Sequence, residues 1–263
     1  MQTSSPYLNA VRAELAPAGP LRAGINFGNV LLTGRDPATG EPRGVAVDLA
    51  RELARRLDVP LEIVPFESAG ALADAAPRRA WDVGFLGAEP QRANDISFTA
   101  AYVEIESTYL VPPGSPVRSV ADMDRDGMRI AVAEKSAYDL YLSRSLQRAR
   151  LERASGFDGS FQLLADAKTD ALAGLRPVLF TCIERLPGSR VLDDRFTTIQ
   201  QAVGTPKGRA AGAAYLRQFV EDVKATGFVA QLIEKNGVRG LTVASASPGP
   251  RVPDTGNTSS DGR

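Results

Sequence analysis

The stretch "GVAVDLARELARRLDVPLEIVPF", residues 44–66, contains the pattern that decides the fold. Apolar residues recur at helical spacing from Val47 to Leu57, with charged residues between them, which predicts an amphipathic helix. We expect Pro60 to end this helix, because proline has no amide proton and its ring clashes inside a helix. The following "LEIVPF" reads as a strand. A helix that leads directly into a strand indicates an α/β unit.

The same alternation continues on both sides of this stretch. "LRAGIN", residues 21–26, predicts a strand before the helix. After "LEIVPF" we expect a helix from Ala69, capped by Ser68, and then the strand "WDVGFL". Repeated strand and helix order is typical of a parallel sheet with right-handed crossovers. The first α/β lobe is therefore predicted to include residues 21–110.

A second α/β lobe is predicted over residues 114–194, because the alternation restarts after "PPGSP", residues 112–116. We interpret "PPGSP" as a connection between lobes. Residues 197–244 supply one strand and two helices without a sheet of their own, so we expect them to return to lobe 1. Two crossings form a hinge, with a ligand cleft between the lobes. Residues 1–20 are predicted to be an N-terminal extension, and residues 245–263, rich in Ser, Pro and Gly, a disordered tail.

Composition excludes several classes of function. Lys plus Arg and Asp plus Glu both number 31, so the chain has no net positive field for nucleic acid or an anionic membrane. The chain has no histidine, which excludes Ser-His-Asp and Cys-His catalysis and HExxH zinc sites. The single Cys182 cannot form an internal disulfide, and we expect it to be a small buried residue. We therefore predict no cofactor, no metal and no nucleic-acid partner.

The first twenty residues contain no apolar run of the length found in signal peptides. No later segment approaches the roughly twenty apolar residues that span a membrane. The sequence as written therefore predicts a cytoplasmic protein without membrane insertion. A trimmed mature form of an exported protein would have the same composition, and it would be periplasmic or extracellular.

Four segments carry a resemblance to a known family: "GVAVDLARELARRL", "WDVGFL", "PQRANDISFTAAY" and "RIAVAEKSAYDLYL". In this order they resemble the bacterial extracellular solute-binding proteins of family 3, the amino-acid receptors of ABC importers. The resemblance covers about residues 21–241 and implies a two-lobed type II periplasmic-binding-protein fold. It also implies a small carboxylate-bearing ligand, an ABC permease as partner and a monomeric protein.

The resemblance implies that Arg92 clamps the ligand's carboxylate. A planar guanidinium matches the geometry of a carboxylate. Arg92 would also follow the carboxyl end of a parallel strand, where α/β proteins bind ligands. The alternative is a surface arginine that pairs with Glu89 or Asp95.

The turn in "AEKSAYDLYL" matches the family's second carboxylate-binding segment, at the start of a helix. Ser136 occupies the hydroxyl position, and it can also act as a helix cap alone. Ala137 stands where a second hydroxyl is common. Lys135 replaces the usual glycine, either as a solvated charge or as a cationic contact to the ligand. Glu134 could pair with a ligand amine.

The chain departs from the family around the carboxylate clamp. The segment between Asp82 and Arg92 is about two residues shorter than usual. The positions that carry hydroxyls in the family hold other residues here: Leu86, Gly87 and Ala88. Backbone groups of this segment, or Glu89, would then contact the ligand.

A second departure concerns the ligand's amine. Family members usually have an aspartate five residues after the aspartate of the "DA" strand, and it pairs with the α-ammonium. Counting from Asp170 gives Leu175, with Arg176 beside it. A buried, unpaired ammonium would cost several kcal/mol. The sequence therefore favours a carboxylate without an α-amino group, or an amine held by Glu89 or Glu134.

Further candidates lie at other strand ends. Asn26 and Asn29 end the first strand, although they would also suit a simple turn. Ala69 falls near a ligand-stacking position of the family. Gln200 and Gln201, in the returning strand, either reach the mouth of the cleft or face solvent.

Three functions remain open at this point. The first is a solute-binding protein that closes on a carboxylate. The second is an enzyme on the same fold, similar to the lyase cyclohexadienyl dehydratase, with Glu134 as base and Lys135 as acid. The third is a cytoplasmic ligand sensor.

Overall fold

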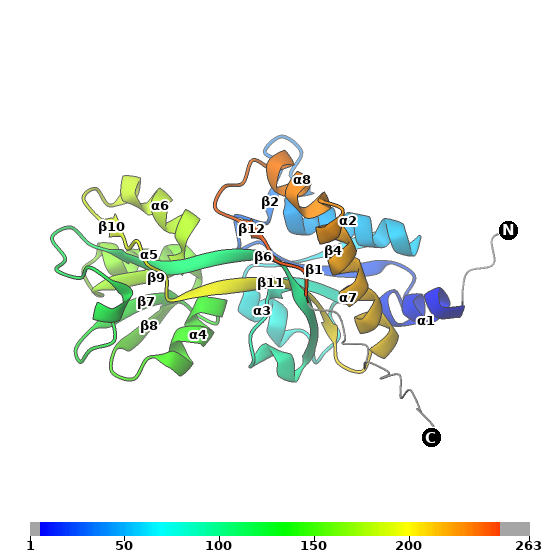
Figure 1. The fold of residues 1–263 in the computed structure, drawn as a ribbon, viewed down its shortest axis with the longest axis horizontal. Helices are drawn as coiled ribbons and strands as arrows, with labels where there is room; N and C mark the ends of the chain where they lie inside the picture. The colour runs from blue at the N-terminus through cyan, green and yellow to red at the C-terminus, as the bar shows by residue number, and fades with distance from the viewer. Residues whose placement is uncertain (1–5, 248–263) are drawn as a thin grey trace, which may run out of the picture.

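The structure is a computed structural model that describes residues 6–247. Figure 1 shows two lobes connected by two long strands, β6 (Ile96–Val111) and β11 (Thr197–Pro206). The main sheet runs through both lobes in the order β4-β1-β5-β11-β6-β9-β7-β8, with β10 and β12 attached to β6. This is the two-lobed α/β architecture that the sequence predicts. Most of the predicted tail, from residue 248 onward, lies outside the described residues.

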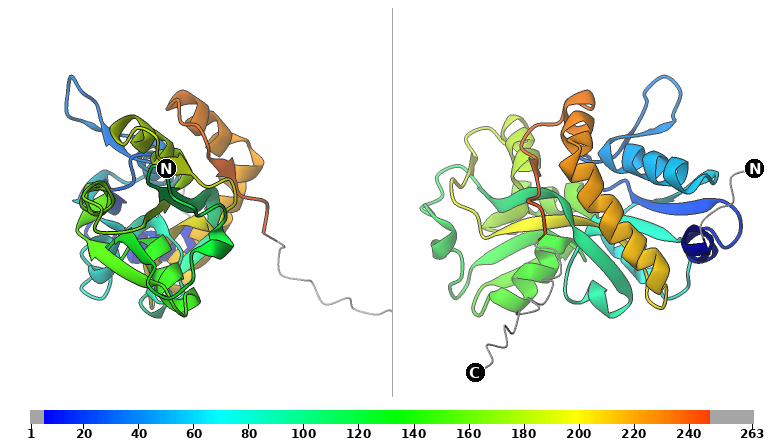
Figure 2. Two further views of the ribbon diagram at one scale, coloured as in Figure 1. Left: turned by 90° about the vertical axis from the view of Figure 1, so that its left-hand side faces the viewer. Right: turned by 45° about the vertical axis from the view of Figure 1, so that its right-hand side comes forward.

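Lobe 1 is built on parallel strands, since β1 pairs with β4 on one side and with β5 on the other. Its elements are α1 (Pro6–Leu15), β1 (Leu21–Asn26), β2 (Gly34–Arg35), β3 (Pro42–Arg43), α2 (Val45–Leu57), β4 (Leu61–Phe66), α3 (Ala69–Asp74), β5 (Val83–Gly87), η1 (Arg92–Asn94), α7 (Ala210–Ala225), α8 (Phe228–Lys235) and β12 (Thr242–Val243). The two C-terminal helices return to lobe 1, as Figure 2 shows.

Helix α2 forms as the apolar periodicity predicts. Leu49, Leu53 and Leu57 are fully buried in the core of lobe 1, and the arginines of the opposite face reach solvent. Burying one such leucine contributes about 1.5–3 kcal/mol. The helix ends at Asp58, which takes the left-handed conformation with φ 53°, before Pro60.

Lobe 2 repeats the pattern, with β7 parallel to both β8 and β9. Its elements are η2 (Val120–Asp122), β7 (Arg129–Ala133), α4 (Ala137–Ser145), β8 (Arg150–Ala154), α5 (Gly156–Ala165), β9 (Ala171–Leu175), α6 (Arg176–Arg185) and β10 (Arg190–Val191). Cys182 is buried in its core, as predicted.

The crossing into lobe 2 lies within β6, not at residues 112–116. Strand β6 pairs with β11 as far as Ser107, and with β9 from Ser107 to Leu110. Its side chains belong to the lobe 1 core at Ile105 and to a lobe 2 core at Tyr109. A continuous strand keeps the backbone groups hydrogen-bonded through the crossing. Residues 112–116 therefore form a turn that already belongs to lobe 2.

The predicted N-terminal extension is partly a structural element. Helix α1 packs against α7, and its Val11 and Leu15 are fully buried. The carboxylate of Glu14 also accepts a hydrogen bond from the backbone N–H of Gly212 in α7. Residues 6–15 therefore belong to lobe 1.

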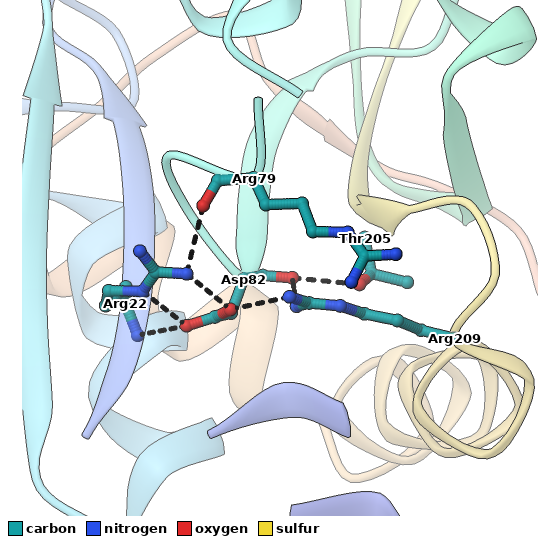
Figure 3. Close-up of polar contacts among 5 residues, drawn as sticks. All are labelled: Arg22, Arg79, Asp82, Thr205 and Arg209. Carbon is teal, nitrogen blue, oxygen red and sulfur yellow. Dashed lines mark hydrogen bonds and ion pairs between the residues drawn. The ribbon is translucent and has the colours of Figure 1, made fainter. Parts of the chain in front are cut away.

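A buried ion network anchors the end of β5 that lies opposite Gly87. Asp82 is fully buried and pairs with Arg22 of β1 at 2.9 Å and with Arg209, before α7, at 2.8 Å (Figure 3). Its carbonyl accepts a hydrogen bond from Thr205 Oγ1 at 2.9 Å. Removing one partner from such a network leaves a buried charge unpaired. The network therefore fixes β5, whose other end leads to Arg92.

Within residues 6–247, no helix is both long enough and apolar enough to cross a membrane.

Candidate ligand-binding site

A cavity of about 450 Å³ lies between the lobes. The carboxyl ends of β1, β4 and β5 reach it from lobe 1, and the first residues of α4 and α5, together with one face of α6, reach it from lobe 2. Parallel topology explains this convergence, because the loops after parallel strands meet at one edge of a sheet. Helix N-termini carry partial positive charge and unsatisfied N–H groups. The helix N-termini therefore favour an anion at their side of the cavity, whose lining also includes the acidic residues Glu67, Glu134 and Asp158.

Arg92 is the most buried charged side chain of this cavity, with 5% of its surface exposed. Its Nη1 donates to the carbonyl oxygen of Gly87 at 2.7 Å, and its Nη2 donates to that of Lys135 at 2.8 Å. Burial lowers the pKa of Arg92 to about 10, so it remains charged at neutral pH. Further N–H groups of the guanidinium can donate to a ligand.

The alternative of a surface arginine is wrong, because Arg92 is buried. Among the described residues it forms no ion pair with Asp or Glu. Glu89 pairs instead with Arg144 of α4, with 2.5 Å between Nη1 and Oε2. Glu89 and Asp74 attract Arg92 only at longer range, so an anionic ligand in direct contact would further offset the cost of burying its charge.

The start of α4 forms the facing wall of the cavity. Ser136 accepts a hydrogen bond from the backbone N–H of Asp139 at 3.1 Å, so it caps the helix while it also lines the cavity. Ala137 lines the cavity beside it, and Glu134 lines it from an exposed position. Burial raises the pKa of Tyr138, another lining residue, to about 12, which keeps its phenol neutral.

Three candidate residues lie outside the cavity. The Nζ of Lys135 bonds to Asp74 at 2.6 Å, across the cleft. The backbone N–H of Ala88 donates to Gln200 of β11 at 2.8 Å, and Glu89 pairs with Arg144. The predicted positions of Lys135, Ala88 and Glu89 on the cavity wall are therefore corrected.

The other candidates from lobe 1 do line the cavity: Asn26, Asn29, Ala69 and Gly87. Both asparagines also shape the turn after β1, because Asn26 Oδ1 accepts from the N–H of Gly28 and Asn29 Oδ1 accepts from that of Leu31. The two interpretations of these asparagines are thus compatible. Gln201 is buried and lines the cavity, whereas Gln200 does not.

Leu175 lines the cavity at the end of β9, but its neighbour Arg176 turns away. The Nε of Arg176 bonds to Glu106 at 2.7 Å, and its Nη1 donates to the carbonyl oxygen of Leu192 at 2.8 Å. Arg176 therefore braces the hinge strand β6. The wall beside Leu175 gains no positive charge from it.

Many lining residues were not predicted, and half of them are next to predicted ones: Phe27, Gly28, Val30, Glu67, Ser68, Ala133, Tyr138, Gly156, Phe157, Asp158, Val178, Thr181, Arg185 and Ile199. Those that directly follow a strand could have been predicted, because loops after parallel strands meet at the ligand-binding edge of the sheet. Phe157 and Asp158 lie in the first turn of α5, which begins at Gly156, and no motif in the sequence singled out that helix start.

A sequence profile described as "Bacterial extracellular solute-binding proteins, family 3" matches residues 32–238. The chain belongs to this family. A general solute-binding role and the predicted family resemblance are thereby confirmed. A glutamine-binding protein of Geobacillus stearothermophilus is 22% identical to this family 3 protein over 205 residues, which are 74% of this chain and 75% of the relative.

Solved structures support the type II periplasmic-binding fold of this family 3 protein. The solute receptor for L-cysteine of Neisseria gonorrhoeae is 21% identical, with a TM-score of 0.74 over 88% of this chain and 95% of that one. The ancestral amino-acid-binding protein AncCDT-1, described as a precursor of cyclohexadienyl dehydratase, is 22% identical, with a TM-score of 0.69 over 84% and 97%. At 21% and 22% sequence identity, these structural similarities show that the chain shares the fold of these proteins.

Proposed function

We propose that this family 3 protein closes on a small ligand that bears a carboxylate, and that Arg92 holds the carboxylate. The observation that carries the proposal is a buried guanidinium at the wall of an interlobe cavity that forms no direct ion pair with an acidic side chain among the described residues. The first turn of α4, with Ser136 and Ala137, faces it and adds N–H groups and a favourable dipole. These features suit one negative charge at this end of the ligand.

The body of the ligand would lie against apolar walls formed by Leu175, Phe157, Val178 and Ile199. We propose an organic acid without an α-ammonium, because Leu175 provides no charge for one. Glu89, which was considered as an amine partner, pairs with Arg144 outside the cavity.

An amine elsewhere in the ligand is the second version of this proposal. Glu134 is exposed at the rim of the cavity and can accept from such a group. A ligand amine remote from the carboxylate therefore fits this site better than an α-ammonium does. L-Glutamine and L-cysteine, named in two relatives, are informative competitors for the screen that follows.

A thermal-shift screen of organic acids, amino acids and their carboxamide analogues tests the proposal. A ligand at about 100 times its Kd stabilises the folded state by about 2.7 kcal/mol. For a chain of this size, that corresponds to a rise in Tm of about 5–10 °C. We expect some acids to give this rise and their carboxamides to give none. Equal shifts for acids and carboxamides would refute a carboxylate clamp.

As the setting of this function we propose that the protein acts outside the cytoplasm, as a monomer that delivers its ligand to an ABC permease. The family is extracellular by description, and one relative is described as an ABC transporter glutamine-binding protein. Cell fractionation and size-exclusion chromatography test these statements. An exclusively cytosolic pool would contradict the location, and a stable dimer would contradict the monomer.

The geometry does not favour the dehydratase alternative. Elimination was assigned to Glu134 as base and Lys135 as acid, but only Glu134 lines the cavity. The Nζ of Lys135 bonds to Asp74, and this hydrogen bond raises the pKa of Lys135. A more basic ammonium, held away from the cavity, is a poorer acid for a bound ligand.

A further inference from the structure

Three contacts join the lobes beside the cavity. From lobe 1, Asp74 pairs with Lys135 at 2.6 Å, Glu89 pairs with Arg144 at 2.5 Å, and Arg92 donates to the carbonyl oxygen of Lys135 at 2.8 Å. Lys135 and Arg144 belong to lobe 2. We call these five residues the interlobe clasp. Because the clasp consists of protein groups alone, it favours the closed arrangement of the lobes by itself.

Lys135 docks on a glycine of the opposite lobe. A Cβ added to Gly70, in α3, would lie 2.6 Å from the Cβ of Lys135 and 3.1 Å from its Cδ. The three heavy atoms nearest to it would all belong to Lys135. Glycine is a poor helix former, so the helix itself gives no reason for glycine at this position. The close approach of Lys135 does give one.

The backbone of Lys135 is held in an uncommon conformation, with φ 54° in the left-handed region. Its N–H donates to Asp139 at 2.8 Å, its carbonyl accepts from Arg92, and its Nζ reaches Asp74. A non-glycine residue persists in this region when its surroundings determine it strongly. Two of these three restraints come from the opposite lobe.

We infer that Lys135 is a positioning residue for Arg92: its docking on Gly70 and Asp74 couples closure of the lobes to the final orientation of the guanidinium. When the lobes separate, Arg92 loses its hydrogen bond to Lys135 and keeps the one to Gly87. The orienting role rests on the proposed function of Arg92. The docking itself does not.

Gly70→Ala tests the docking without any ligand. The added methyl suits a helix and conflicts only with Lys135, so the closed arrangement should be disfavoured in a folded protein. Lys135→Gly in the same chain removes this conflict but also the bond to Asp74, so it should restore closure only in part. Gly159→Ala, in α5, is a matched control, because its new Cβ would meet only Ala154 of its own lobe.

The measurement is the distance distribution between spin labels on exposed residues of the two lobes, at Glu62 and Glu184, in a Cys182→Ala background. Gly70→Ala should reduce the short-distance population at least twofold, whereas the Gly159→Ala control should retain it and the double variant should recover part of it. An unchanged distribution in Gly70→Ala would overturn the docking. Thermal unfolding of each variant confirms that it is folded.

Affinity for an acid found in the thermal-shift screen tests the orienting role separately. Gly70→Ala should weaken binding at least tenfold, and the double variant should stay weaker than wild type because the side chain that reaches Asp74 is absent, whereas Gly159→Ala should bind as wild type does. Unchanged affinity in Gly70→Ala would overturn the role of Lys135 in positioning Arg92. If no acid binds the wild-type protein, the proposed function fails, and the spin-label distances still decide the docking.

Discussion

Replacing Arg92 by methionine should abolish most of the affinity for a carboxylate ligand. Only 5% of the surface of Arg92 is exposed, and the residue lines the interlobe cavity. A carboxylate there would accept a pair of charge-assisted hydrogen bonds, each contributing about 1.5–3 kcal/mol. Their loss, about 3–6 kcal/mol, raises Kd by about two to four orders of magnitude at about 1.4 kcal/mol per factor of ten.

Isothermal titration calorimetry with the best acid from the screen measures this change. Methionine keeps the apolar stem of the side chain, and removal of a buried charge offsets part of the loss of the bonds to Gly87 and Lys135. The same substitution at Arg150, an exposed arginine of β8, is the control and should leave Kd unchanged. A Kd for Arg92→Met within about threefold of wild type, in a protein with a normal unfolding transition, would refute the carboxylate clamp.

Three further predictions follow from the same contacts. Leu175→Asp should raise the affinity for an α-amino acid at least tenfold relative to the affinity for the same acid without its amine, because the new carboxylate faces the ammonium. Calorimetry with such pairs of ligands measures the difference. Asp82→Asn should lower the free energy of unfolding by about 3–5 kcal/mol in urea, because the guanidinium of Arg209 is buried and loses its charged partner. Hydrogen bonds from Arg55 and Arg56 lower the pKa of Glu52 to about 2, below its value in the unfolded chain. The stabilisation from these contacts is therefore complete above about pH 4 and is lost as the pH falls through 2. Glu52→Gln should flatten that part of the acid-unfolding curve.

Much of the fold could be predicted from periodicity and topology. Helix α2 and its neighbouring strands follow directly from the pattern in residues 44–66. The position of the crossing could not be predicted, because "PPGSP" has the composition of a linker while the apolar residues of β6 run through both lobes. The packing of α1 on α7 depends on two segments about 200 residues apart, which local pattern does not connect.

The site was predictable where it depends on strand ends and not where it depends on contacts between the lobes. Asn26 and Leu175 lie at the cavity because they end strands, and Arg92 lies there because it follows the carboxyl end of β5. The pairing of Glu89 with Arg144 joins residues of different lobes, so no local pattern indicates it. The side chain of Lys135 leaves the cavity because of contacts with the opposite lobe, which the sequence does not display.

A crystal structure of the protein with the strongest acid from the screen tests the central claim most directly. The account predicts a carboxylate between the lobes, with its oxygens about 2.7–3.0 Å from the guanidinium nitrogens of Arg92 and beside the first turn of α4. A ligand bound elsewhere, such as in the groove between α2 and α8 that Arg51 and Lys235 line, would contradict it. So would a ligand in the interlobe cavity whose carboxylate points away from Arg92.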